Sequence, residues 1–174
     1  AKSGAQPFFT ASYAKDHVCR NADCVNLAAH CTEGGTLQAV EALLTELARI
    51  RAHGFTSREI EAARSELISE AEASYAESSK MKSEDLKDEY LGHYLRGEPV
   101  MDPATEARVN TMLLKEITAA EVQAVAFEYT KAKGMVIQTI EPPHGRVGRS
   151  EDVAAVVEMV GGMEAGREIS VHPD

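Results

Sequence analysis

A group of histidine and cysteine residues near the start of the chain offers the side chains best suited to bind a metal ion. The group comprises His17, Cys19, Cys24, His30, Cys31 and Glu33. Imidazole and thiolate groups are common zinc ligands, but zinc sites show characteristic spacings such as C-x-x-C or H-x-x-x-H. Neither spacing occurs in the sequence. Residues 23–31 are predicted to form a strand that points Cys24 and Cys31 to opposite faces, so we expect thiols that are buried or half-buried rather than a zinc site.

A second metal-like pattern lies at the end of the same predicted strand. His30-Cys31-Thr32-Glu33 matches four positions of the zinc motif H-x-x-E-H, but Gly34 stands where the second histidine is needed. The motif also needs a helix to bring both histidines to one face. An independent enzyme that uses His30, Cys31 and Glu33 is therefore the least favoured interpretation. No phosphate-binding glycine loop or G-x-S-x-G motif is present, and we assign no catalytic, cofactor-binding or metal-binding residue.

Length and charge limit the class of protein and its partners. The 174 residues suffice for one domain, or for one domain plus an appendage. A net charge of -10 makes nucleic acid and anionic membrane surfaces poor partners. No apolar run reaches the roughly 20 residues of a membrane-spanning helix, and the first residues show no signal-peptide pattern. Three cysteines do not indicate a disulfide framework, so an intracellular, reducing compartment is expected.

The first third of the chain predicts two strands and two long helices. The strands are expected at 7–16 and 23–32, joined over 18–22 by a connection too long for a two-residue hairpin. An apolar stripe at helical spacing follows, and its helix ends at Gly54, which suits the left-handed position after a helix. Thr56 and Glu59 then form a capping box that opens a helix to about Ser78. We interpret the many glutamates of this helix as solvated surface.

The rest of the chain predicts shorter elements. Helices are expected from Ser83 to Arg96, after Asp102-Pro103, and from the Thr118–Glu121 capping box to near Gly134. Residues 135–140 read as an apolar strand. We therefore divide the chain into a domain at 1–142 and an appendage at 143–174. The appendage is expected to hold a linker, a helix at 150–160 that Gly161-Gly162 breaks, and a loose tail or approach to a further domain.

The order and spacing of these signals resemble a known family. The segments that carry the resemblance are 46–60 (ELARIRAHGFTSREI), 116–122 (EITAAEV) and 7–12 (PFFTAS). They are similar to the non-catalytic domains of pitrilysin/insulinase zinc metallopeptidases, and especially to the "predicted zinc protease" branch of bacteria and plastid-bearing organisms. The resemblance covers residues 7 to about 142. It implies an α/β fold of the α+β roll type, in which an antiparallel-rich sheet packs against several long helices.

The resemblance also implies where the chemistry lies. Family catalysis belongs to a preceding domain, in which H-x-x-E-H binds zinc, and no part of that motif can be carried onto this chain. Family members hold substrate with an arginine and a tyrosine, but Arg96, Tyr90 and Tyr94 cannot be aligned with that pair. The resemblance therefore implies a structural, substrate-enclosing domain of a zinc metalloendopeptidase that degrades peptides or unfolded segments, with no cofactor in this chain and no activity alone.

Two further expectations concern partners and the extent of the chain. Family domains of this kind usually begin with additional strands and helices, so the chain is either a fragment or a reduced relative. Its partners would be other domains of the same metallopeptidase and the peptide substrates, and a second copy could cover an open sheet edge. The alternative function is a stand-alone protein–protein interaction module of the same fold without protease activity. A chloroplast or another organelle is compatible with the expected intracellular, reducing compartment.

Overall fold

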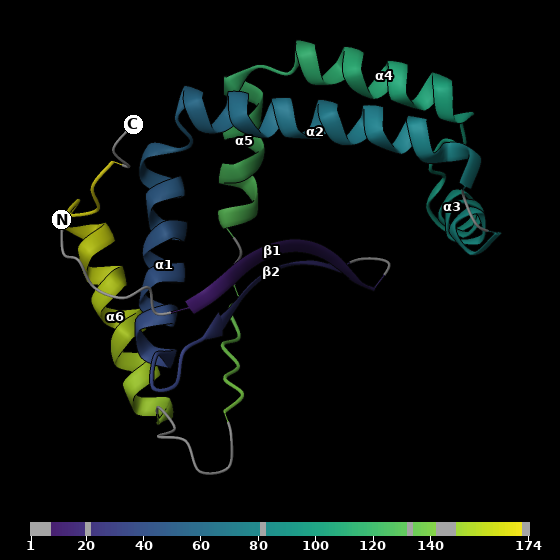
Figure 1. Ribbon diagram of the computed structural model, residues 1–174. Helices are drawn as coiled ribbons and strands as arrows, with labels where there is room; N and C mark the ends of the chain where they lie inside the picture. The colour runs from purple at the N-terminus through teal and green to yellow at the C-terminus, as the bar shows by residue number, and fades with distance from the viewer. Residues whose placement is uncertain (1–7, 20–21, 81–82, 132–133, 142–148, 172–174) are drawn as a thin grey trace. The chain divides into compact units, whose positions relative to one another are not determined.

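The computed structural model describes residues 8–19, 22–80, 83–131, 134–141 and 149–171, and it divides into two compact units (Figure 1). The first unit comprises the described parts of Ala1–Gly54 and Gln123–Pro173, and the second comprises those of Phe55–Val122. The described residues form one antiparallel pair of strands and six α-helices. The predicted α+β fold class is therefore confirmed. The predicted division at residue 142 remains a prediction.

The first unit begins with a long antiparallel hairpin. Strand β1 (Phe8–Cys19) pairs with strand β2 (Ala22–Cys31), and Tyr13 lies opposite Leu27. One face of β2 is half-buried, as the alternation in the sequence predicted; its residues are Val25, Leu27, Ala29 and Cys31. Among the described residues each strand pairs only with the other, so each has an outer edge without a strand partner. An open sheet edge was expected from the sequence.

The predicted connection over residues 18–22 is wrong, because both strands continue further toward each other. Cys19 pairs with Ala22, and the register shifts between His17 and Cys19. An irregularity of this kind inserts an extra residue and lets a ladder continue past a position where simple alternation fails. The two residues left between the strands, 20–21, lie outside the described residues.

A lysine on the hairpin joins it to helix α5 (Ala119–Thr130). The Nζ atom of Lys15 lies 3.1 Å from Oδ2 of Asp23 and 5.1 Å from the centroid of the Tyr129 ring. Hydrogen bonding with Tyr129 raises the pKa of Lys15 most, and hydrogen bonding with the Asp23 carboxylate raises it further. The Lys15 ammonium group therefore contacts both β2 and α5 within the first unit.

The core of the first unit lies between helix α1 (Thr36–His53) and helix α6 (Ser150–Ala165), which run side by side in Figure 1. Ala48, Val160 and Ile169 are buried there. Leu44, Val156 and Met163 pack against them. Burying each large aliphatic side chain contributes about 1.5–3 kcal/mol to folding.

The expected helix break is therefore wrong, and so is the expectation of a loose tail up to Ile169; the approach to a further domain, the alternative for residues 163–174, remains a prediction. The glycine pair Gly161-Gly162 does not break the helix, which continues to Ala165. The segment after it is not a loose tail as far as Ile169, which is 6% exposed and accepts a hydrogen bond from His53 Nε2 to its carbonyl at 2.8 Å. Two helical glycines cost about 2 kcal/mol relative to alanine. The apolar contacts of Val160, Met163 and Ile169 with α1 outweigh that cost.

The glycine pair gives the first prediction. An added Cβ at Gly161 or Gly162 meets no atom within 4 Å. Gly161→Ala and Gly162→Ala are each expected to raise the free energy of unfolding by about 0.5–1 kcal/mol, because alanine restricts the unfolded chain and favours the helix. Urea unfolding followed by circular dichroism measures this change. A loss of stability in both variants would show that the glycines are needed for close packing.

An ion pair ties the last turn of α1 to α6. Arg51 donates from Nε to Glu164 Oε1 and from Nη2 to Glu164 Oε2, each at 2.7 Å. Both side chains are about 30% exposed, at 29% and 31%. The paired guanidinium lowers the pKa of Glu164. A bidentate geometry of this kind is the one in which a partly exposed pair contributes measurably to stability.

The ion pair predicts a pH dependence. A lowered carboxyl pKa in the folded state stabilises the protein above the unfolded value of about 4.3, and this contribution is lost as the pH falls through the folded value. Glu164→Gln is expected to lower the free energy of unfolding by about 0.5–1 kcal/mol at pH 7 and to match the parent chain at pH 3. Glu158→Gln, on an exposed position of α6, is the control and should change neither value. An equal deficit at both pH values would contradict a charge effect.

The second unit contains helices α2 (Ser57–Glu77), α3 (Ser83–Arg96) and α4 (Pro103–Glu116), with a short 3₁₀ turn at Ser78–Lys80. Asp102 caps α4 by accepting from Thr105 N at 3.1 Å, and Pro103 follows at the first helical position, as predicted. The predicted capping box of α5 is also present, with Thr118 N donating to Glu121 Oε2 at 2.8 Å. This helix ends at Thr130, a few residues before the predicted end near Gly134.

The predicted strand at 135–140 is wrong as a strand, because no described residue pairs with it in a ladder. Its side chains still alternate: Ile137 and Thr139 are half-buried against α6, whereas Val136 and Ile140 are 94% and 87% exposed. The sequence pattern reports which side chains face a neighbour, but a strand also needs a hydrogen-bonding partner for its backbone. That partner cannot be predicted from the segment itself.

Candidate functional site

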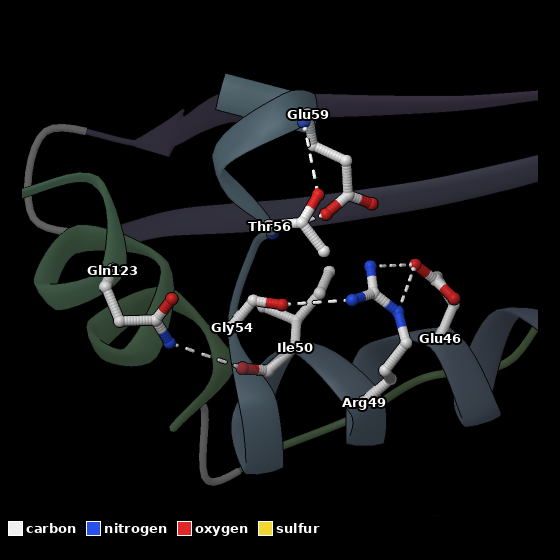
Figure 2. A network of polar contacts seen from close by, with 7 residues as sticks. All are labelled: Glu46, Arg49, Ile50, Gly54, Thr56, Glu59 and Gln123. Atoms are coloured by element: carbon white, nitrogen blue, oxygen red, sulfur yellow. Dashed lines mark hydrogen bonds and ion pairs between the residues drawn. The ribbon is translucent and has the colours of Figure 1, made fainter. Parts of the chain in front are cut away.

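The segment with the strongest sequence signal forms a cluster of polar contacts at the end of α1, drawn in Figure 2. We call this cluster the joint; its residues are Glu46, Arg49, Ile50, Gly54 and Gln123. Arg49 is only 5% exposed, the lowest exposure of any charged side chain described. Its Nε and Nη2 atoms donate to Oε1 of Glu46, with the Nε contact at 2.9 Å. Its Nη1 atom donates to the carbonyl oxygen of Gly54 at 3.0 Å. The buried guanidinium is therefore hydrogen-bonded to a carboxylate and to the backbone just past the helix end.

Gly54 is the residue that ends α1, and its conformation excludes other residue types. Its backbone has φ 72° and ψ -151°, a region that is essentially restricted to glycine. An added Cβ would lie 1.7 Å from Oε1 of Gln123, a residue of α5. Gln123 Nε2 also donates to the carbonyl of Ile50 at 3.5 Å, and the Gly54 amide donates to the same carbonyl at 3.0 Å. Gln123 therefore fills the space that the missing side chain leaves.

The second unit begins with the capping box predicted from the sequence. The Glu59 amide donates to Thr56 Oγ1 at 3.2 Å, and the Thr56 amide donates to Glu59 Oε2 at 2.7 Å. Figure 2 shows this reciprocal pair at the first turn of α2. Both bonds satisfy amide groups that a helix start leaves without partners, which fixes where α2 begins.

The joint has the chemistry of a structural support. A guanidinium ion does not give up a proton in proteins, and Glu46 and Arg49 already engage one another. No side chain of the joint is a nucleophile paired with a base, which covalent catalysis requires. What the arrangement can do is fix the end of α1 and hold Gln123 of α5 against it within the first unit.

The hairpin separates the sequence candidates for metal binding instead of bringing them together. Cys24 is exposed and lies opposite Asp16, whereas Cys31 is half-buried on the other face and lies opposite Phe8. His30 lies six positions after Cys24, a distance of about 20 Å along the strand, far beyond the reach of ligands of one ion. Glu33 and His30 are exposed. The side chains of His17 and Cys19 lie outside the described residues.

The described side chains therefore do not fit zinc. No group of three or more histidine, cysteine, aspartate or glutamate residues among them could hold a metal ion. The described helices also include none with the length and apolar character needed to cross a lipid bilayer.

The arginine and tyrosines of α3 do not form a recognisable site either. Tyr90 and Tyr94 are 58% and 85% exposed. Arg96 donates from Nη2 to Glu98 Oε2 at 3.1 Å, and hydrogen bonding with that glutamate raises the pKa of the arginine. These contacts belong to the end of α3, where His93 Nδ1 also lies 2.6 Å from the Glu98 carbonyl oxygen.

Sequence reasoning missed the residues that hold the joint. Arg49 had one detectable signal, because Glu46 precedes it by three positions on a helix. Gln123 had no such signal in the sequence, because the residue that it contacts, Ile50, lies 73 positions earlier in the chain. The residues of the Arg51–Glu164 pair are 113 positions apart, and no local sequence pattern indicates this pair either. Local rules find caps and i, i+3 pairs, and they do not find partners that only the fold brings together.

Comparison with known proteins gives two findings. The chain is 38% identical over 96 residues, 55% of its length, to a protein described as "Zinc protease PQQL-like" from Arabidopsis thaliana. It matches 97% of its length to the crystal structure of the first half of the periplasmic protease PqqL from Escherichia coli, with a TM-score of 0.73 and 13% identity. The chain spans 10% of the Arabidopsis protein and 36% of the solved PqqL chain. No protein-family model matches it.

The two findings support different statements. At 13% identity the PqqL structure shows the fold alone, and the sequence match shows a relationship to a zinc protease over about half of the chain. The expected resemblance is thereby confirmed: over about half of its length, this chain is similar to one part of a protein described as a PQQL-like zinc protease.

Proposed function

We propose that this chain serves as a non-catalytic, substrate-enclosing domain of a zinc metalloendopeptidase that degrades peptides or unfolded segments. The observation that carries the proposal is the 38% identity to a zinc protease, over a segment much shorter than that protein. The side chains described here do not supply a zinc-binding set. The chain would contribute shape to the enclosure, and its partners would be the other domains of the same protease and the peptide substrate.

A cleavage assay tests the proposal. The purified chain is incubated with a quenched fluorescent peptide and with reduced, unfolded casein, with and without added zinc. We expect no cleavage above the rate of buffer alone, because the zinc ligands and the general base of this chemistry would lie in another domain. Cleavage that stops when a chelator is added, and returns with zinc, would contradict the non-catalytic role.

The alternative is a stand-alone interaction module of the same fold. The two roles differ in what the coding sequence contains. An H-x-x-E-H motif encoded upstream in the same reading frame would support the protease domain. A start codon directly before Ala1 would support the module. The length of the Arabidopsis relative favours the first role.

We also propose an intracellular, reducing location, with which a chloroplast or another organelle is compatible. Cys24 and Cys31 are free thiols, which is the usual state in such a compartment. Fractionation of the source cells, followed by immunodetection, would test the location. Detection only in an oxidising, extracellular fraction would contradict it.

A second copy pairing along the free edge of β1 or β2 remains a prediction. Sedimentation equilibrium at high protein concentration should then show a dimer. A monomer at every concentration would count against pairing.

A further inference from the structure

An apolar groove lies in the second unit between α2 and α4, which lie side by side in Figure 1. Its volume is about 490 Å³. The apolar lining consists of Leu67, Ala71, Leu113, Leu114 and Ile117. No residue of either helix is buried. Leu67, Leu113 and Ile117 are 46%, 47% and 40% exposed, so the two helices present an uncovered apolar surface.

The two helices are held in place at one end of this groove, so the surface has a defined shape. Arg64, in the first half of α2, donates from Nη2 to the carbonyl oxygen of Ile117 at 2.9 Å and from Nη1 to that of Leu114. These carbonyls belong to the last turn of α4, where helix carbonyls have no partner within the helix and favour a cation. The first half of α2 therefore lies against the end of α4, and the helices run antiparallel.

The second unit carries most of the chain's negative charge. Residues 55–122 contain fifteen aspartates and glutamates and eight lysines and arginines, so they carry -7 of the chain's net charge of -10. Glu70 lines the groove, and Glu66 lies one helical turn before it on the same side of α2. Both are exposed, and neither forms an ion pair within the described part of the chain. An occupant would therefore meet apolar side chains flanked by unpaired carboxylates.

The charge and the shape of the groove decide which kind of partner it can bind. A second copy would bring Glu66 and Glu70 of another unit with a net charge of -7 against the same side chains of the first, and like charges at close range disfavour that contact. An extended peptide adds to a sheet edge through its backbone, but the backbone groups in the middle of α2 and α4 are already bonded within their helices. A helix needs only an apolar stripe that matches the groove and positive side chains at its borders.

We propose that the α2–α4 groove binds an amphipathic helix of a partner protein whose apolar stripe is flanked by lysine and arginine. The apolar lining supplies the contact, and the carboxylates beside it supply attraction and orientation. The inference does not depend on the proposed role in a protease, because it rests on the shape and charge of the second unit alone.

The test uses the whole chain and a fluorescein-labelled helical peptide of about 18 residues, with leucine at helical spacing and lysine elsewhere. Fluorescence anisotropy is expected to show saturable 1:1 binding that weakens by about tenfold between 50 and 300 mM NaCl, as screening reduces charge attraction. A scrambled peptide of equal composition, and a peptide with glutamate in place of lysine, should bind at least about tenfold more weakly.

Matched variants locate the binding surface. Leu113 lines the groove, whereas its neighbour Met112 does not and is equally exposed, at 48%. Glu70 lines the groove, whereas Glu72 lies about 160° away around α2. Leu113→Gln and Glu70→Gln should each weaken binding about fivefold or more, and Met112→Gln and Glu72→Gln less than about twofold. Circular dichroism confirms that each variant is folded.

Several results would overturn the inference. No saturable binding at low salt would do so. Equal binding of the designed and scrambled peptides would show attraction to charge alone. An equal effect of all four substitutions would place binding elsewhere. A dimer of the parent chain that Leu113→Gln dissociates would identify the occupant as a second copy.

Discussion

Replacing Gly54 by alanine is expected to lower the free energy of unfolding by about 3 kcal/mol, the largest effect of any single substitution considered. The backbone at φ 72° and ψ -151° excludes a side chain, and the new Cβ would lie 1.7 Å from Gln123 Oε1. Gln123 could move aside, but it would then leave its contact with the Ile50 carbonyl. Urea unfolding followed by circular dichroism measures the loss.

Two further variants separate backbone strain from the steric clash. Gly34 has a similar φ of 74°, but an added Cβ there meets no atom within 4 Å. Gly34→Ala should therefore cost only about 1–2 kcal/mol, the usual cost of a left-handed residue with a side chain. Combining Gly54→Ala with Gln123→Ala should restore about 1 kcal/mol, the part due to the clash. Full recovery of stability in the double variant would mean that the backbone conformation of Gly54 does not cause the loss. An unchanged stability in Gly54→Ala would contradict the role of Gly54 in the joint.

Replacing Arg49 by methionine is expected to lower the free energy of unfolding by about 2–3 kcal/mol. Methionine keeps much of the buried volume but leaves the Gly54 carbonyl without the guanidinium donor and removes the partner of Glu46. Glu46 is half exposed, at 51%, so water can solvate its charge and the loss stays below that of a fully buried pair. Thermal and urea unfolding would both detect the change.

The controls for Arg49 test the geometry of its contacts. Arg49→Lys should recover less than half of the loss, because one ammonium group cannot reproduce the forked contacts to Glu46 and Gly54. Arg58→Met, at an exposed position of α2, should change stability by less than about 0.5 kcal/mol. If Arg49→Met matched Arg58→Met, the buried guanidinium would not hold the joint.

The elements that the sequence predicted well are those with local causes. The capping boxes at Thr56–Glu59 and Thr118–Glu121 fix helix starts through contacts three residues apart, so a reader of the sequence can find them. The half-buried face of β2 follows from alternation along one strand. These signals, in their order, also carried the resemblance to a protease family that the comparison with the Arabidopsis protein supports.

The elements that were missed depend on contacts between distant residues. The glycine pair in α6 looked like a helix end, but packing on α1 carries the helix through it. The segment 135–140 looked like a strand, but the described residues offer it no paired neighbour. The contact of Gln123 with Ile50 is made by the fold, and no local sequence pattern indicates it. Local propensity is a weak guide wherever tertiary packing decides the outcome.

The zinc content of the purified chain tests the central claim most directly. The chain is freed of any tag, dialysed against a weak chelator to remove loosely bound metal, and analysed by elemental spectrometry. We expect less than about a tenth of an equivalent of zinc, because genuine protein sites hold the ion tightly and this chain is proposed to have none. One equivalent of tightly held zinc would contradict the account. The side chains to substitute would then be those of His17, Cys19, Cys24, His30, Cys31 and Glu33.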